Sequence, residues 1–205
     1  KASADLISQT YMGTFKLPIC ILRPNNLYGE RQYIEKIIPA IINSISYKKI
    51  LKIHGRGKTI RRFLHVDDLS AAIELLIKKS KTGEIYNIGG NFRIQIYDLV
   101  KLCFQLSKKK MTSLCRFVKD RPFNDSRYYL SFQKLTSLGW KPSRTLHHSL
   151  PDLVTWYHHT NITHHWGTLA ELDLQPHTQT HTSHTPHISH IPHITHSTHT
   201  KHTRT

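Results

Sequence analysis

Two polar side chains that could contact a ligand stand beside apolar segments that predict buried strands. Asn26 follows the continuous apolar run 19–22, and such a run suits a strand of a parallel sheet. It therefore falls at the carboxyl edge, where open α/β sheets bind ligands. Arg61 precedes the apolar run 63–66 and carries the paired donors that phosphate oxygens accept. Asn26 is therefore a candidate ligand contact and Arg61 a candidate phosphate contact; a turn asparagine and a surface arginine are the alternatives.

The charge of the chain also favours an anionic ligand. The 205 residues include 29 Lys and Arg against 13 Asp and Glu, a formal net charge of +16. A basic domain attracts polyanions of any kind, so nucleic acid is one candidate partner. The basic residues are spread along the chain, and aromatic residues do not interleave with them in a base-stacking pattern. A solvated basic surface is the favoured interpretation, a nucleoside diphosphate is the next, and we expect no nucleic-acid partner.

The composition excludes several other classes of protein. No apolar run reaches the roughly 18 residues that a membrane span needs. Three cysteines cannot form a disulfide framework, so we expect a reducing, cytoplasmic location. No signal-peptide pattern opens the sequence, and its first residue is lysine, so we expect an upstream part to be missing from it.

The elements that must position these residues follow from the apolar spacing. Strand and helix patterns alternate along residues 1–160, which predicts an α/β domain. Residues 25–29 are expected to form a polar loop. Helices are expected over 1–15, from Pro39, from a cap at Asp67 or Asp68, over 95–107, over 131–138 and from about Ser149 to 159; strands are expected over 19–22, 51–54, 63–66 and 85–88.

The C-terminal segment has a different composition. From His181 to His202 a histidine occupies every third position, eight in all. This period matches the polyproline II turn, which makes metal capture one hypothesis. Ordering each residue costs ~1–2 kcal/mol, and three isoleucines at ~2 kcal/mol each cannot offset that cost over the segment. We therefore predict a disordered His/Thr-rich tail over 161–205 and no metal site.

Longer motifs carry a resemblance to a known family. They occur in one order along residues 1–159, and the ordered series is more specific than any single member. Together they resemble the dTDP-glucose 4,6-dehydratases of the NAD-dependent epimerase/dehydratase family, which are extended short-chain dehydrogenases. The motifs are Lys-Ala-Ser-Ala-Asp at 1–5, Arg-Pro-Asn-Asn-Leu-Tyr-Gly at 23–29, Glu-Lys-Ile-Ile-Pro at 35–39, Ile-His-Gly at 53–55, Arg-Arg-Phe-Leu-His-Val-Asp-Asp at 61–68, Gly-Glu-Ile-Tyr-Asn-Ile-Gly-Gly at 83–90, Asp-Arg-Pro at 120–122 and Leu-Gly-Trp-Lys-Pro at 138–142.

The resemblance implies a fold and an activity. It implies the C-terminal part of a Rossmann-like domain together with a small α/β domain that binds the nucleotide sugar. In the family, bound NAD takes hydride from C4 of the sugar, water is lost across C5–C6, and the hydride returns to C6. It further implies a nucleotide-sugar substrate and a homodimer in the intact enzyme.

The resemblance also assigns roles to individual residues. Lys1 matches the lysine of the Tyr-x-x-x-Lys motif, which stabilises the catalytic tyrosinate and contacts the nicotinamide ribose, so it is expected to be catalytic and cofactor-binding. Tyr128 is expected either on the nucleoside or in the core. The expected substrate-binding residues are Asn26, Lys36, Ile37, Lys52, Ile53, His54, Arg61, Asp120, Arg121, Pro122 and Asn124.

Several family features are absent or altered. The glycine-rich phosphate loop, the catalytic tyrosine and the proton-transfer acids would all precede Lys1, so we expect these 205 residues alone to be inactive. Arg62 stands where the family has an acid, and Glu30 stands where it has proline. Another nucleotide-sugar epimerase or decarboxylase, or a binding protein without catalysis, are the alternatives.

Overall fold

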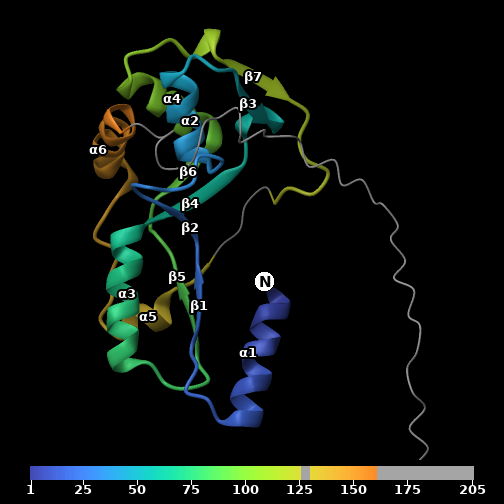
Figure 1. Ribbon diagram of the computed structural model, residues 1–205, viewed down its shortest axis with the longest axis vertical. Coiled ribbons are helices and arrows are strands. Elements are labelled where there is room, and N and C mark those ends of the chain that lie inside the picture. Colours follow the sequence, from blue (N-terminus) through green and yellow to red (C-terminus); the bar gives the residue numbers. More distant parts are fainter. Residues whose placement is uncertain (126–129, 161–205) are drawn as a thin grey trace, which may run out of the picture.

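The computed structural model describes residues 1–125 and 130–160 (Figure 1). Tyr128 and the tail 161–205 lie outside the described residues, so the expectations for both stay predictions. No helix of the described part is long and apolar enough to cross a membrane. The elements in chain order are α1 (Ala2–Phe15), β1 (Ile21–Pro24), β2 (Asn26–Tyr28), α2 (Ile37–Ser46), β3 (Leu51–His54), the 3₁₀ turn Gly55–Gly57, β4 (Ile60–His65), α3 (Val66–Lys79), β5 (Ile85–Ile88), β6 (Arg93–Gln95), α4 (Ile96–Leu106), the 3₁₀ turn Met111–Ser113, β7 (Cys115–Val118), α5 (Gln133–Ser137) and α6 (Leu146–His159).

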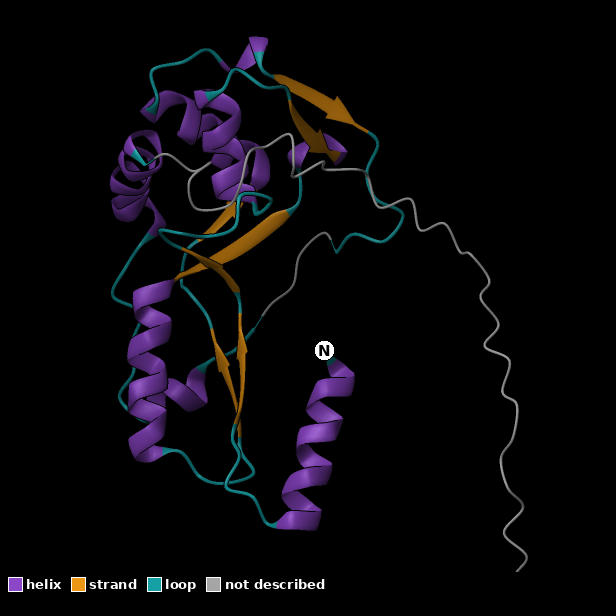
Figure 2. Cartoon of the chain, in the orientation of Figure 1, coloured by secondary structure: helices purple, strands orange, loops and turns teal. Residues whose placement is uncertain are grey.

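The described strands form three small, mostly parallel sheets (Figure 2). β1 runs parallel to β5, and β3 runs parallel to β7. β4 lies between β2, to which it is parallel, and β6, to which it is antiparallel. A Cβ on Gly90 would lie 2.0 Å from the carbonyl oxygen of Phe63, so only glycine lets the chain after β5 pass this close to β4.

The larger core lies between α2, α4 and α6, which sit together in the upper part of Figure 1. Ile41, Leu99 and Leu150, one from each helix, are completely buried in it. Their neighbours recur at spacings of three and four, so each helix presents an apolar stripe inward. This core supports β2, β4 and β6 and therefore fixes the strand that carries Arg61.

The smaller core lies beside β1 and β5, below the first in the same view. Leu76 of α3, Ile88 of β5 and Leu135 of α5 are buried there. Trp140 joins them, and its indole N–H donates to the main-chain oxygen of Asp68 at 3.1 Å. The two cores share the strand β4, because Phe63 packs in the larger and Leu64 in the smaller.

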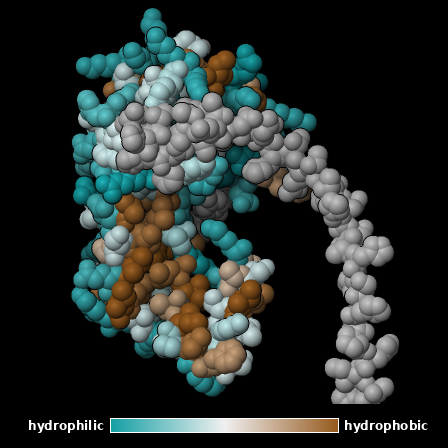
Figure 3. All heavy atoms as spheres, in the orientation of Figure 1, coloured by the Kyte–Doolittle hydropathy of each residue, from teal (hydrophilic) through white to brown (hydrophobic). Residues whose placement is uncertain are grey.

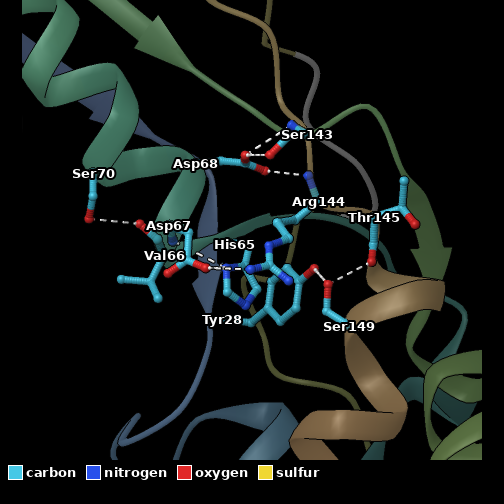
Figure 4. A network of polar contacts seen from close by, with 10 residues as sticks. All are labelled: Tyr28, His65, Val66, Asp67, Asp68, Ser70, Ser143, Arg144, Thr145 and Ser149. Carbon is cyan, nitrogen blue, oxygen red and sulfur yellow. Dashed lines mark hydrogen bonds and ion pairs between the residues drawn. The ribbon is translucent and has the colours of Figure 1, made fainter.

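A polar network joins α3 to the segment that leads into α6 (Figure 4). The buried carboxylate of Asp68 accepts from the backbone and hydroxyl of Ser143 at 2.9 and 2.7 Å and from the backbone of Arg144 at 3.0 Å. The Tyr28 hydroxyl donates to Ser149, whose own hydroxyl donates to the Thr145 carbonyl. The network therefore ties the two cores together through side chains at the end of β2 and the start of α3 and α6.

Two expected helix starts are wrong. α3 begins at Val66, because Nδ1 of His65 accepts from the Asp67 backbone N–H at 3.1 Å and acts as the cap. α2 begins at Ile37, which makes Pro39 its third residue; proline is tolerated there because the first-turn N–H groups need no partner within the helix.

The expected start of α6 and the expected loop 25–29 are also wrong. α6 begins at Leu146, because the Thr145 hydroxyl caps it by accepting from His148, and Pro151 falls inside the helix. Within the loop, Asn26–Tyr28 form β2, because the parallel strand β4 supplies hydrogen-bond partners that the local sequence does not reveal. The strands β6 and β7 were not expected either.

The helix α1 forms as expected but buries none of its residues. Leu6, Ile7, Tyr11 and Phe15 are all more than half exposed. In the space-filling view, apolar side chains accordingly reach the surface over α1 and α3 (Figure 3). The side chain of Asp5 pairs with Arg23 at the end of β1, with 2.6 Å between Oδ2 and Nη2.

Candidate functional site

One cavity of about 690 Å³ lies where several elements end. It receives the segment after β1, the strand β3, the start of β4, and the loop that follows β7. The N-cap or first residue of three helices also lines it: Lys1 of α1, Lys36 and Ile37 of α2, and Ile96 of α4. The full lining is Lys1, Pro24, Asn25, Asn26, Leu27, Gln32, Lys36, Ile37, Leu51, Lys52, Ile53, His54, Thr59, Arg61, Phe63, Ile96, Arg121 and Asn124.

The cavity brings together most residues that the sequence singled out. Two of them, Asp120 and Pro122, do not line it and are exposed. The others come from six separate segments of the chain, so only the fold makes them neighbours. The expected residues that line the cavity are Lys1, Asn26, Lys36, Ile37, Lys52, Ile53, His54, Arg61, Arg121 and Asn124.

The wall of the cavity is strongly basic. It carries three lysines and two arginines, whereas no Asp or Glu of the described residues lines it. Residues at the N-terminal ends of three helices line the cavity as well, and the positive ends of the helix dipoles add to its attraction for anions. Apolar side chains such as Ile37, Leu51 and Ile53 supply the rest of one wall. The cavity therefore suits a ligand that combines negative charge with an apolar or planar part.

The guanidinium of Arg61 is held by the loop after β7. Its Nη2 donates to Oδ1 of Asn124 at 3.0 Å, and its Nη1 donates to the main-chain oxygens of Asp125 at 2.8 Å and Ile60 at 3.0 Å. The next residue, Arg62, is opposite Arg93 in the β4–β6 ladder and does not line the cavity. Arg61 is therefore the basic side chain that β4 directs to the cavity.

The loop itself is anchored to the turn after β3. His54 Nδ1 lies 3.2 Å from the Lys119 carbonyl oxygen. The Asp120 carboxylate accepts from the Arg121 backbone N–H at 2.8 Å and from Asn124 at 2.9 Å. It lies so close to Gly55, whose φ is +57°, that a Cβ there would be 2.3 Å from Oδ2. Gly55 therefore permits the close approach that brings Asp120 to Asn124.

A buried tyrosine fixes the turn that carries Gln32 into the cavity. The hydroxyl of Tyr157, on α6, accepts from the Gln32 backbone N–H at 3.0 Å and lies within hydrogen-bond distance of the Gly29 and Gln32 carbonyl oxygens. Burial raises the pKa of this hydroxyl to about 12. The neutral tyrosine is therefore a structural anchor rather than an acid or base at neutral pH.

Several lining residues were missed by sequence reasoning. Thr59 stands two residues before Arg61, and alternation along an extended chain puts the two on one face. That signal was available for Thr59. Leu51, Phe63 and Ile96 give no such signal, because apolar residues next to strands and helices usually belong to a core. Among the described residues, no group of three His, Cys, Asp or Glu is placed to hold a metal ion.

Comparison with known sequences relates the chain to enzymes of sugar metabolism. Residues 1–89 match the model of the NAD dependent epimerase/dehydratase family. The dTDP-D-glucose 4,6-dehydratase of Bos taurus is 37% identical over 181 residues, which cover 86% of this chain and 50% of that protein. A trifunctional UDP-glucose 4,6-dehydratase of Arabidopsis thaliana, which is also named as an epimerase and a reductase, is 35% identical over 177 residues, covering 86% of this chain and 26% of that protein. The chain thus spans half the length of the bovine relative.

Solved structures of similar fold belong to the same group of enzymes. The dTDP-glucose 4,6-dehydratase DesIV of Streptomyces venezuelae, with NAD and TYD bound, has a TM-score of 0.76 and 31% identity over 81% of this chain and 51% of that one. The UDP-glucuronic acid 4-epimerase of Bacillus cereus, in complex with UDP-glucuronic acid and NAD, has a TM-score of 0.71 and 26% identity over 77% of this chain and 50% of that one. These likenesses confirm the Rossmann-like α/β fold expected from the sequence.

Proposed function

We propose, for a chain whose residues 1–89 match the model of the NAD dependent epimerase/dehydratase family, that the cavity binds the nucleoside diphosphate part of a nucleotide sugar. We further propose that the protein acts as an NAD-dependent dTDP-glucose 4,6-dehydratase, with residues 1–160 forming part of its catalytic domain. The chain spans half the length of its bovine relative, so the activity of the whole protein is part of this proposal.

The observation that carries the proposal is the charge of the cavity. Five Lys and Arg side chains and three helix N-termini face a cavity without a carboxylate from the described residues. A diphosphate carries the charge that these groups complement, and an arginine offers it paired, charge-assisted hydrogen bonds. A nucleic-acid strand fits less well, because it needs an extended groove with exposed aromatic platforms rather than a cavity of about 690 Å³.

The lining residues fall into two proposed roles. Arg61, Lys52 and Asn26 bind the diphosphate, because they combine two cations with an amide that offers both a donor and an acceptor. Ile37 and Ile53 contact the nucleoside, whose planar base buries apolar surface well. Asp120 and Pro122 do not line the cavity, so their expected direct contact with the substrate stays a prediction.

Two features of the cavity fit a nicotinamide nucleotide. Lys1 lines it, and its ammonium stabilises nearby oxyanions and donates to ribose hydroxyls. Nδ2 of Asn25 is buried in its wall with no hydrogen-bond partner among the described residues, so it offers a donor to an amide oxygen. NAD, when bound, would supply the hydride acceptor for oxidation at the sugar.

Further parts of the proposal concern the state of the protein. The 205 residues contain no glycine-rich dinucleotide loop, so we expect a polypeptide made of these residues alone to leave dTDP-glucose unconverted. We also propose a homodimer, since α1 exposes apolar side chains of the kind that subunits bury, and a cytoplasmic location, since Cys20, Cys103 and Cys115 are all free thiols. Nucleic acid is not among the proposed partners.

Titration of dTDP into the full chain by calorimetry tests the binding proposal. Replacing Arg61 with Ala removes charge-assisted bonds to phosphate worth about 1.5–3 kcal/mol, so affinity should fall roughly tenfold to a hundredfold. Arg62→Ala is the matched control, because Arg62 does not line the cavity, and it should change the affinity by less than about twofold. Equal affinities of the two variants would refute the assignment.

Product analysis separates the proposed dehydratase from its alternative. When the whole protein is incubated with dTDP-glucose and NAD, a dehydratase forms a 4-keto-6-deoxy sugar nucleotide, whereas a 4-epimerase forms a sugar nucleotide of the same mass as the substrate. Likeness to the Bacillus cereus epimerase keeps this second activity open to test. Mass spectrometry of the nucleotide product distinguishes them, because dehydration removes one water.

A further inference from the structure

We infer that Asn124 is a positioning residue, which binds the nucleotide through Arg61 rather than by direct contact, and that Asp120 and Thr59 set its orientation. This inference rests on the proposed function, since it concerns the same cavity. It assigns to Asn124 a different role from that of a direct substrate ligand.

The hydrogen bonds of Asn124 carry the inference. Its Oδ1 accepts from Arg61 Nη2 at 3.0 Å. Its Nδ2 donates to the Asp120 carboxylate at 2.9 Å and to the Thr59 hydroxyl at 3.2 Å. A side-chain amide has two N–H donors, so both are used within the protein. A ligand would therefore have to displace one of these partners to accept a hydrogen bond from Asn124.

The chemistry of the partners allows only one orientation of the amide. A guanidinium only donates, and an ionised carboxylate only accepts. Rotating the amide by half a turn would place its N–H₂ against Arg61 and its oxygen against Asp120, which gives two repulsive contacts. An uncharged amide is thus the group that can bridge this cation and this anion while keeping Arg61 charged.

The bridge acts on the freedom of the arginine. A long arginine side chain loses much rotamer entropy when a ligand immobilises it. In this structure the Arg61 side chain is already immobilised, because Nη1 donates to the Asp125 carbonyl oxygen and Nη2 donates to Asn124. Ligand binding therefore costs less rotamer entropy. The guanidinium is therefore already held at the cavity wall before a ligand arrives, which is pre-organisation of an anion site.

The anchoring of Asp120 extends the same argument outward. The carboxylate is fixed by the Arg121 backbone N–H and by its close packing on Gly55. This explains why Asp120 lies outside the cavity lining although it is next to Arg121, which lines it. Its proposed role is to hold Asn124, which in turn holds Arg61, the residue that contacts the ligand.

A double-mutant cycle measured with dTDP on the full chain tests the inference. Asn124→Ala should weaken dTDP binding about fivefold to tenfold in the presence of Arg61, and by less than about twofold when Arg61 is already Ala. A direct contact between Asn124 and the nucleotide would instead give the same loss in both backgrounds. Phe123→Ala is the matched control, because Phe123 is a fully exposed neighbour in the loop and should leave the affinity unchanged.

A second variant covers the case in which Asn124→Ala fails to fold. Thr59→Val keeps the shape of the side chain and removes only the hydroxyl that accepts from Asn124, so it should weaken binding about twofold, again only when Arg61 is present. If either variant lost as much dTDP affinity in the Arg61→Ala background as it does with Arg61 present, the positioning role would be overturned. The proposal that the cavity binds a nucleotide would be unaffected by that result. Failure of the folded, unsubstituted chain to bind dTDP would instead overturn the proposed function and this inference with it.

Discussion

The helices α4 and α1 have apolar residues at similar spacings but very different surroundings. α4 buries Leu99, Val100, Cys103 and Phe104 against α2 and α6. α1 buries nothing, and its Leu6 is 64% exposed. The comparison teaches that an apolar stripe predicts a helix, whereas its burial depends on which other elements reach it.

The same contrast separates two basic residues that line the cavity, Arg61 and Lys1. Arg61 lies on a strand that both cores support and donates hydrogen bonds to Ile60, Asn124 and Asp125. Lys1, in contrast, caps a helix that buries no residue and that the exposed Asp5–Arg23 pair ties to β1. Exposed ion pairs contribute only about 0–1 kcal/mol. The position of Arg61 is therefore fixed much more firmly than that of Lys1.

The largest expected effect comes from truncating the same residue type in the two helices. Leu99→Ala should lower the free energy of unfolding by about 3–4 kcal/mol, because it removes a fully buried side chain and leaves a cavity. Leu6→Ala should change it by less than about 0.5 kcal/mol, since Leu6 is exposed and alanine favours the helix. Urea denaturation of both variants measures the difference, and a comparable loss in Leu6→Ala would show that α1 is buried in solution.

The link between the two cores gives the next effect. Asp68→Ala should cost about 2–3 kcal/mol, because three donors from Ser143 and Arg144 lose a buried, charged acceptor. Asp67→Ala is the matched control: its carboxylate is 57% exposed and pairs with Arg144 at 3.1 Å, so its loss should cost less than about 1 kcal/mol. Similar denaturation midpoints for the two variants would argue against a clamp at Asp68.

The smallest expected effect tests a contact at the exposed edge of the larger core. His158 of α6 lies 2.9 Å from the hydroxyl of Ser46 and 3.4 Å from that of Ser107, at the ends of α2 and α4. Partial burial, with the nearby charges of His159 and Lys109, lowers the pKa of His158 below its usual value of 6.5. The unfolded chain therefore takes up a proton at higher pH than the folded chain, and stability falls as the pH drops below 6.5.

Replacing His158 with Gln isolates this contribution from the other histidines. Between about pH 7.5 and about pH 5.5, the thermal midpoint of the unsubstituted chain should drop further than that of the variant, by less than about 2 °C. An identical drop in both proteins would show that the ring does not distinguish the folded from the unfolded state.

Much of the local structure was accessible from the sequence, and the exceptions have a common cause. The helix over 95–107 and the strands 51–54 and 85–88 were confirmed nearly to the residue, because their apolar periods are strong and turn residues bound them. The strand Asn26–Tyr28 was missed, because its pairing with β4 depends on residues distant in the chain. The start of α6 was missed because a helix supported by a core tolerates Pro151 within it.

The sequence by itself determined which side chains are available to bind an anion: the basic and amide side chains, their order along the chain and their place beside predicted strand ends. The tertiary structure alone decided which of them meet. It brings Asn26, Arg61 and Asn124 to one cavity, because β4 pairs beside β2 and the loop after β7 returns across β3. It also decided that Asp120 faces Asn124 while Arg121 faces the cavity, since that choice depends on the space left by Gly55 and not on any local pattern.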